Sequence, residues 1–176
     1  MVRTIHYRVG QFLRALAASV PQEQVKQATR VLPPEAHKIF RRQAVQDQRH
    51  ALEVYHTLCR AGEDNSHLLA AALLHDAGKA AGRLPPWRRA AIVLMGHITP
   101  RLLARLSKGE PRGWRRPFVV HARHPEIGAC WATEARCSPL TVALIRRHHD
   151  ELTCCPAAVA EENQLLAALQ AADRIN

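Results

Sequence analysis

Apolar residues recur three or four positions apart along most of the chain, which is the spacing of amphipathic helices. A first helix is predicted before Pro21, with apolar positions at Ile5, Val9, Phe12, Leu13 and Leu16. A second helix is expected over residues 22–31. After the Pro33–Pro34 pair, a long helix is expected over residues 35–60, with Gly62 as its C-terminal stop.

The rest of the apolar pattern also predicts helices. One follows Asn65–Ser66, which can cap its N-terminus, and ends at His75–Asp76, where Gly78 lets the chain turn. Further helices are expected from Pro85–Pro86 through Met95 and over 100–108, 125–136, 139–149 and 157–173. Residues 108–117 form the clearest predicted loop. Predicted core positions in the last two helices are Leu144, Ile145, Leu165, Leu166 and Leu169.

The composition agrees with this helical pattern. Ala and Leu dominate the apolar residues, and aromatic residues make up only 5% of the 176 residues. Such a composition favours packed helices over a sheet, and the length is typical of one domain. We therefore predict an all-α, single-domain helical bundle.

The formal net charge of +10 predicts a surface that attracts anions such as phosphate esters, nucleotides, nucleic acid or acidic lipid. The five cysteines include no CxxC pair, so we expect reduced thiols rather than a disulfide framework or a zinc knuckle. No stretch approaches the roughly 20 apolar residues that span a bilayer. We expect a soluble, cytoplasmic protein without a transmembrane segment, and an oligomer is compatible with the sequence.

The most distinctive chemical feature is the pair His75–Asp76 at the end of an apolar run, in the sequence Leu-Leu-His-Asp-Ala-Gly-Lys. Imidazoles and carboxylates without cysteine indicate a catalytic site for one or two divalent metal ions, among Fe, Mn, Co, Ni, Mg and Zn. A helical bundle can bring such residues together in its interior. Other ligand-type residues before and after the pair are His50, His124, His148, His149 and Asp173.

The order His50, His75–Asp76 and Asp173, with this sequence around the pair, resembles the HD-domain superfamily of metal-dependent phosphohydrolases. The resemblance covers roughly residues 44–176 and leaves residues 1–43 as an N-terminal helical extension that packs on the HD domain. It implies an α-helical bundle of the HD type. It also implies that a first metal is bound by His50, His75, Asp76 and Asp173.

The segments 124–129 and 145–150 resemble the additional histidine motifs of the two-metal branches of this superfamily. The resemblance would therefore assign a second metal to His124, His148 and His149. His121 competes with His124 for this role, and the following Pro125 and Gly128 favour His124.

Two departures from the cyclic-dinucleotide phosphodiesterase branch, HD-GYP, bear on the substrate. Gln46 stands where that branch can have a Glu one helical turn before the first His, and no Gly-Tyr-Pro follows His149. Cyclic di-GMP is therefore not a supported substrate. Lys79 also departs from the His-Asp-x-Gly-His form that is common in deoxynucleoside triphosphate hydrolases.

The resulting prediction is a metal-dependent phosphohydrolase that cleaves a phosphate ester or anhydride of a nucleotide or similar small anion, by attack of a metal-bound hydroxide. Asp76 would bridge the metals, and Lys79, Arg146 or Arg147 would bind the substrate phosphate. For Lys79, a solvated cation at a helix end is the alternative. For the whole chain, the alternative is a catalytically silent module that binds a nucleotide or nucleic acid and holds a structural metal.

Two further segments have an ordinary interpretation and a functional one. Trp114 lies in a basic loop, where a tryptophan usually anchors the loop on the core, and stacking on a base or contact with lipid are the alternatives. For the apolar stretch 90–106, core packing is favoured over a membrane surface.

Ordinary surface or hydrogen-bonded histidines are expected at His56, His67 and His97.

Overall fold

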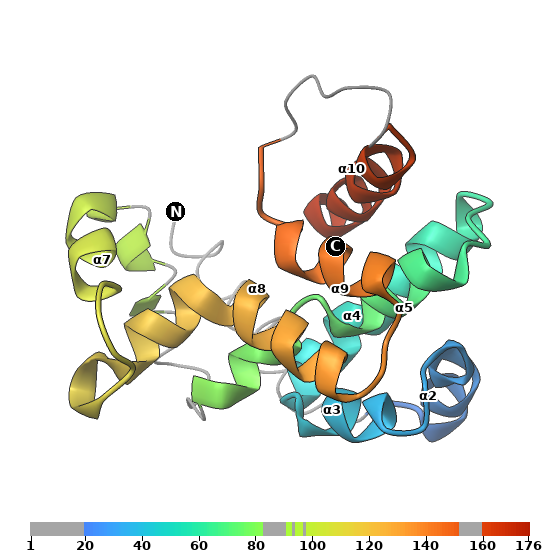
Figure 1. Cartoon of the computed structure of the whole chain (residues 1–176), viewed down its shortest axis with the longest axis horizontal. Coiled ribbons are helices and arrows are strands. Elements are labelled where there is room, and N and C mark those ends of the chain that lie inside the picture. Colours follow the sequence, from blue (N-terminus) through green and yellow to red (C-terminus); the bar gives the residue numbers. More distant parts are fainter. Residues whose placement is uncertain (1–19, 83–90, 93, 97, 152–159) are drawn as a thin grey trace, which may run out of the picture.

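The computed structural model describes residues 20–82, 91–92, 94–96, 98–151 and 160–176, and these residues form helices and turns without a strand (Figure 1). The prediction of an all-α fold is confirmed. The helix expected over residues 5–16 and the helix opening expected at Pro85–Pro86 lie outside the described residues. The described elements are α2 (Gln22–Ala28), η1 (Thr29–Val31), α3 (Ala36–Arg42), α4 (Val45–Arg60), α5 (Ser66–Leu74), η2 (Ala77–Gly82), α7 (Pro100–Leu106), η3 (Gly113–Arg115), α8 (Arg116–Glu134), α9 (Pro139–Arg147) and α10 (Ala160–Ile175).

Helix α5 lies at the centre of the hydrophobic core. All of its residues from Leu68 to Leu74 are buried, as expected for a helix that is apolar on every side. It packs against α3, α4, α9 and α10. Because His75 directly follows this helix, the pair His75–Asp76 lies in the interior of the molecule.

The core positions predicted in the last two helices are confirmed. Leu144, Ile145, Leu166 and Leu169 are buried, and Leu165 is half-buried against the same core. Helices α9 and α10 therefore cover α5 with the faces that their apolar spacing predicts.

The single helix expected over residues 35–60 is wrong, because the chain breaks it into α3 and α4. Gln43 and Ala44 are extended, with ψ of 148° and 154°. The buried side chain of Gln43 donates from Nε2 to the carbonyl of Leu73 at 2.9 Å, and Gln48 Nε2 donates to the Gln43 carbonyl at 2.9 Å. The Leu73 carbonyl belongs to the last turn of α5, where carbonyls lack a helical partner. Gln43 therefore provides a hydrogen-bond partner for a carbonyl at the end of α5, and the chain at Gln43 is extended instead of helical.

The helix ends predicted around residues 60–66 are confirmed. Gly62 has a φ of 87°, and the amides of Gly62 and Glu63 donate to the carbonyls of Cys59 and Leu58, which is the Schellman arrangement. Asn65 Oδ1 accepts hydrogen bonds from the amides of His67 and Leu68 and caps α5. These caps fix the direction in which α5 leads to His75.

Helix α8 begins at Arg116, nine residues before the helix start expected at 125, and it contains Pro125 in its interior. Pro117 lies in its first turn, where proline costs no helical hydrogen bond. The predicted loop 108–117 is therefore shorter than expected and contains the single turn η3. Helix α9 ends at Arg147 instead of residue 149, so that His148 is its C-terminal cap.

The predicted boundary between residues 43 and 44 falls at the break between α3 and α4. Ile39 and Phe40 of α3 nevertheless belong to the same hydrophobic core as α4 and α5. Among the described residues, no helix has both the length and the apolar character needed to cross a membrane.

Candidate metal centre

Seven ligand-type residues from five helices lie around the C-terminal end of α5. Helix α4 provides His50, helix α8 provides His124 and helix α10 provides Asp173, whereas the other four lie at the ends of α5 and α9. Four of the side chains are buried, namely His75, Asp76, His124 and His148. The structure therefore brings together all of the residues proposed as ligands from the sequence.

The first group consists of His50, His75 and Asp76, whose ligand atoms lie within 4.8 Å of one another. Asp173 joins them: its Oδ1 is 2.8 Å from His50 Nε2 and 3.5 Å from His75 Nε2. Two imidazoles and two carboxylates thus face one point between α4, α5 and α10.

The second group consists of His124, His148 and His149, whose ligand atoms also lie within 4.8 Å of one another. Asp76 lies between the groups. Its Oδ1 is 3.3 Å from His124 Nε2 and 3.8 Å from His148 Nε2, and its Oδ2 is 3.6 Å from His75 Nε2. This is the position that a carboxylate bridging two ions would take.

Three histidines are held by the same hydrogen bond, in which Nδ1 donates to the backbone carbonyl three residues earlier. His75 donates to Ala72 at 2.9 Å, His124 to His121 at 2.7 Å and His148 to Ile145 at 2.7 Å. Because a carbonyl oxygen can only accept, Nδ1 carries the proton and the neutral ring keeps its lone pair on Nε2. Histidine ligands of metals are commonly fixed in this way.

The accepting carbonyls are available because of local helix geometry. Ala72 lies in the last turn of α5 and Ile145 in the last turn of α9, where carbonyls lack an amide four residues ahead. The carbonyl of His121 lies inside α8, but the residue four positions ahead is Pro125, which has no amide hydrogen. Two helix ends and one proline therefore orient the three rings.

The buried atoms of the cluster lack protein partners that would satisfy them. Among the described residues, the Nε2 atoms of His75, His124 and His148 and Asp76 Oδ1 are buried without a hydrogen bond. Ligands that bind an ion at about 2.1 Å lie roughly 3–3.5 Å from one another, close to the spacing of these side chains. A divalent ion therefore fits the donor set, the spacing and the unsatisfied atoms.

Burial lowers the pKa of His148 to about 3, and the adjacent imidazoles of His75 and His149 act in the same direction. The Nε2 lone pair of His148 is therefore available throughout the neutral range. Burial also acts to lower the pKa of His75, but the carboxylates of Asp76 and Asp173 outweigh it and raise that pKa. A proton on His75 Nε2 would thus compete with a metal ion for the same lone pair.

Both carboxylates are held in the ionised form. Burial alone would raise the pKa of Asp76, but His75, His124 and Lys79 hold it well below its usual value. Burial alone would also raise the pKa of Asp173, but its hydrogen bond to His50 and the nearby imidazole of His75 lower it. The cluster therefore offers two negative charges at neutral pH.

Lys79 lies at this cluster, with its Nζ 2.5 Å from Asp76 Oδ2. The two arginines proposed to bind phosphate, in contrast to Lys79, have no described contact with the cluster. Arg147 forms ion pairs with Glu162 and Asp150 and donates to Asn163 at 3.0 Å, so that its guanidinium links α9 to α10. Arg146 is exposed, and no described contact joins it to the cluster.

A close approach of two backbones sets the distance between Asp76 and His124. A Cβ placed on Gly78 of η2 would lie 2.0 Å from the carbonyl oxygen of His124 and 2.8 Å from the amide nitrogen of Gly128. Glycine at 78 is therefore required for η2 to lie against α8. This contact holds the Asp76 carboxylate against the second group of histidines.

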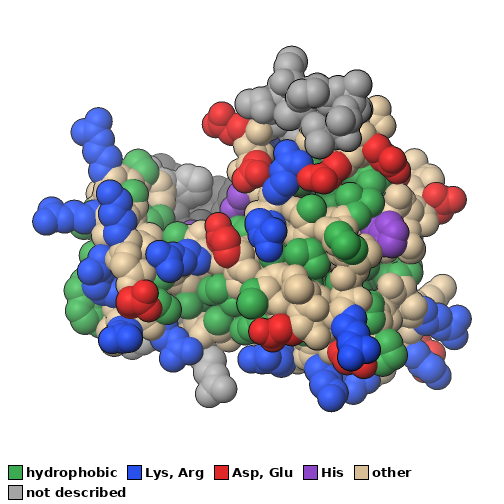
Figure 2. Space-filling view, in the orientation of Figure 1, with side chains coloured by type: hydrophobic (Ala, Val, Ile, Leu, Met, Phe, Trp, Pro, Cys, Tyr) green, Lys and Arg blue, Asp and Glu red, His purple; other side chains and the backbone are tan. Residues whose placement is uncertain are grey.

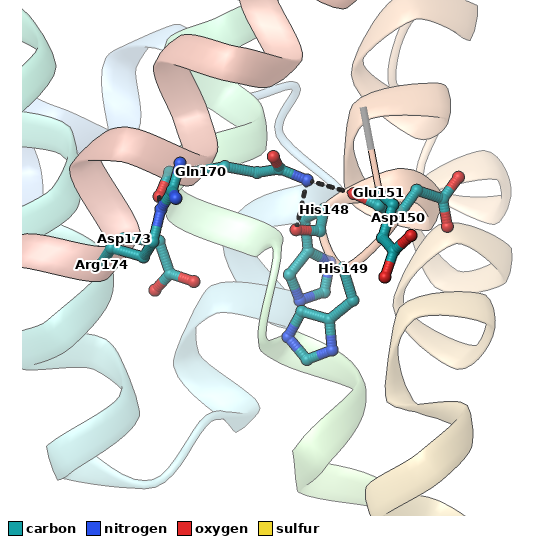
Figure 3. A pocket seen from close by; sticks show the side chains of 7 residues that line it. All are labelled: His148, His149, Asp150, Glu151, Gln170, Asp173 and Arg174. Atoms are coloured by element: carbon teal, nitrogen blue, oxygen red, sulfur yellow. Dashed lines mark hydrogen bonds between the residues drawn. The ribbon is translucent and has the colours of Figure 1, made fainter. Parts of the chain in front are cut away.

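A pocket of about 560 Å³ borders the cluster, and its lining includes His149, Glu151, Gln170, Asp173 and Arg174 (Figure 3). Gln170 Nε2 donates to the carbonyls of His148 and Asp150, at 3.1 Å and 2.8 Å, and so ties α10 to the turn after α9. The pocket opens one side of the cluster, at His149, to the surface.

Sequence reasoning missed several residues that build the site. Gln170 lies three positions before Asp173 on the same helix face, so its spacing from Asp173 was a usable signal. Arg174 directly follows Asp173, a spacing that does not by itself indicate a shared face. Gln43 gave no local signal, because its partner Leu73 is 30 positions away. The end of α10 is held by Asn176, which donates to the carbonyl of Ala172 at 2.7 Å.

Comparisons of this chain with protein-family models, with curated proteins and with solved structures found no match.

Proposed function

We propose that this chain is a metal-dependent phosphohydrolase of the HD-domain type, which cleaves a phosphate ester or anhydride of a nucleotide or similar small anion. The observation that carries the proposal is the set of buried, unsatisfied atoms at one place: three Nε2 lone pairs and Asp76 Oδ1. Leaving such atoms without partners costs free energy, and a divalent cation would provide the partner for all of them.

One ion would be held by His50, His75, Asp76 and Asp173, and a second by His124, His148 and His149 with Asp76 between them. When bound, such ions lower the pKa of a water molecule toward neutrality and polarise a phosphoryl oxygen.

The protein's own side chains would orient the substrate. The ammonium of Lys79 has three donors, and its contact with Asp76 Oδ2 leaves others for a phosphate oxygen. Arg174 lies in the wall of the pocket formed by α10 and adds a second positive charge. The opposite wall carries Asp150 and Glu151, whose carboxylates can accept hydrogen bonds from hydroxyl groups of a substrate.

The pocket supports catalysis over the alternative of a silent module with a structural metal. Structural metal sites are usually closed by protein ligands, whereas catalytic sites keep an open position. Here the exposed ring of His149 and the adjoining pocket leave one side of the cluster accessible.

The test is hydrolysis with Mn, Co, Ni, Fe and Mg across panels of nucleotides and generic phosphoesters. We expect turnover with at least one metal and a loss of at least about a hundredfold in His75→Ala and in Asp76→Ala. The matched control is His56→Ala, since this histidine of α4 contacts Tyr55 and lies outside both ligand groups. Absence of turnover with every metal, together with tight, salt-sensitive nucleic-acid binding, would support the silent module instead.

A further inference from the structure

The part of the chain between Ala91 and Phe118, here named the basic lobe, exposes large apolar side chains. Trp114 is 70% exposed, Ile98 69%, Leu94 58% and Leu102 46%. The expectation that Trp114 anchors its loop on the core is therefore wrong. The stretch 90–106 was expected to pack in the core. Ile92 is buried as expected, but Leu94, Ile98 and Leu102 are exposed.

Specific contacts hold together α7 and η3, the two elements that carry Leu102 and Trp114. The guanidinium of Arg115 donates to the carbonyls of Arg105, Leu106 and Lys108 and fixes η3 to the end of α7. Ser107 Oγ donates to the carbonyl of Phe118 at 3.1 Å. An apolar pocket of about 340 Å³, with Trp114 in its wall, opens on this surface.

The lobe is also strongly basic. Between residues 91 and 118 the sequence has one acidic residue, Glu110, against Arg101, Arg105, Lys108, Arg112, Arg115 and Arg116. Figure 2 shows lysine and arginine side chains gathered over the part of the molecule that contains α7, with hydrophobic surface between them. The charge predicts an anionic partner, and the exposed apolar side chains predict a partner with an apolar layer.

We propose that the basic lobe binds the surface of an anionic lipid membrane. Arginine and lysine side chains would pair with lipid phosphates while Leu102, Ile98 and Trp114 enter the interface, which is how amphipathic surfaces bind membranes. Aliphatic side chains neither stack on bases nor pair with a nucleic-acid backbone, which argues against RNA or DNA. A second copy of this chain would bring the same positive charge to the surface, which argues against self-association.

This inference goes beyond the proposed phosphohydrolase and uses different residues, since none of the ligand-type residues of the cluster belongs to the lobe. An experiment can therefore disprove the membrane proposal without affecting the phosphohydrolase proposal, and the reverse. The experiment is sedimentation of the full chain with vesicles of phosphatidylcholine alone or mixed with phosphatidylglycerol. We expect binding to the anionic vesicles, with weaker binding as salt rises, and no sedimentation with neutral vesicles.

Two double variants test the two components of the surface. Leu102→Ser with Trp114→Ser and Arg101→Glu with Arg105→Glu should each weaken partitioning at least roughly tenfold. The apolar control is Val45→Ser, because Val45 is 47% exposed but lies on α4. The charge control is Lys26→Glu with Arg30→Glu, which makes the same charge change near α2. Both controls should bind like the parent chain.

Equal binding to neutral and anionic vesicles, or no binding to either, overturns the proposal. So does equal weakening by the variants and their controls, because binding would then not depend on the position of the changed residues in the lobe. Binding of single-stranded RNA that the lobe variants abolish, without vesicle binding, would assign the surface to nucleic acid. A concentration-dependent dimer abolished by Leu102→Ser with Trp114→Ser would assign it to a second copy.

Discussion

His124 donates a hydrogen bond from Nδ1 to the backbone carbonyl of His121, at 2.7 Å. In an uninterrupted helix this carbonyl would accept from the amide of residue 125, and Pro125 has no amide hydrogen. The proline therefore decides which nitrogen of His124 keeps its lone pair. It also places that nitrogen 3.3 Å from Asp76 Oδ1.

Replacement of Pro125 by alanine should weaken metal binding without unfolding the protein. The new amide would compete with His124 Nδ1 for the His121 carbonyl, and loss of such an orienting hydrogen bond typically costs about tenfold or more in metal affinity. Thermal stability of the chelated protein should not fall, since proline is unfavourable inside a helix. Competition titration against a chromophoric chelator measures the affinity.

The control for this change is Pro139→Ala, because Pro139 lies in the first turn of α9, where proline removes no helical hydrogen bond. It should leave the metal affinity unchanged. Equal affinities for the parent chain and Pro125→Ala would mean that the proline does not orient His124.

Metal content should approach two ions per chain after anaerobic purification, because two groups of ligand atoms flank Asp76. His124→Ala should reduce the content toward one ion, since it removes a ligand of the second group only. Elemental analysis against protein concentration measures the ratio. A parent value near one that His124→Ala leaves unchanged would rule out the second ion.

Gly78→Ala should be strongly destabilising, by more than about 3 kcal/mol. The new Cβ would meet the backbone of His124 at 2.0 Å, so that η2 and α8 must separate. Denaturant unfolding measures the loss. Gly62→Ala is the control: its φ of 87° strains an alanine, but no atom lies within 4 Å, so a cost of only about 1 kcal/mol is expected. Similar losses in the two variants would contradict the close approach.

The chelated protein should be most stable near pH 6.5. Folded His148 has a pKa of about 3 and folded His121, mainly through burial, one of about 4. Below pH 6.5 the unfolded chain binds protons that these folded groups do not, so stability falls as the pH drops, by about 1.4 kcal/mol per pH unit for each fully shifted group. The raised pKa of His75 acts on the other side, since its stabilising proton is lost as the pH rises through that pKa.

Denaturant unfolding between about pH 4.5 and 8.5 in chelator measures this profile. The carboxylates of Asp76 and Asp173 contribute no slope above about pH 5, because the stability from their lowered pKa values is lost only as the unfolded carboxyl groups begin to bind protons. Below about pH 5 they act in the same direction as His148 and His121. Added metal should move the maximum to higher pH, since an ion replaces the proton at His75. A stability that rises as the pH falls from 6.5 to 4.5 would contradict the assignment.

Local features explain why much of the fold could be predicted from the sequence. The apolar spacing gave the helices, and Asn65 and Gly62 marked two helix ends because their capping bonds involve residues only a few positions away. The core positions Leu144 and Leu169 followed from the same spacing. The ligand types were visible in the sequence, but their convergence required the packing of α4, α8 and α10 around α5.

The errors arose where a distant or unusual hydrogen bond decided the backbone. The break at Gln43 depends on the carbonyl of Leu73, which no local pattern reveals. Helix α8 continues through Pro125 because a side chain takes the orphaned carbonyl, which helix-breaking rules do not consider. Trp114 was expected on the core because tryptophan usually packs there, whereas its exposure depends on how α7 and η3 are held together.

The hydrogen bond between His50 and Asp173 joins residues 123 positions apart. The entropy cost of closing a loop rises with its length, and here it is offset by the packing of α4 against α10. An ion shared by these two side chains would act as a crosslink between distant parts of the chain. Its binding free energy would be available to the folded state alone. The metal centre would therefore also be a clasp that holds the C-terminal helix on the domain.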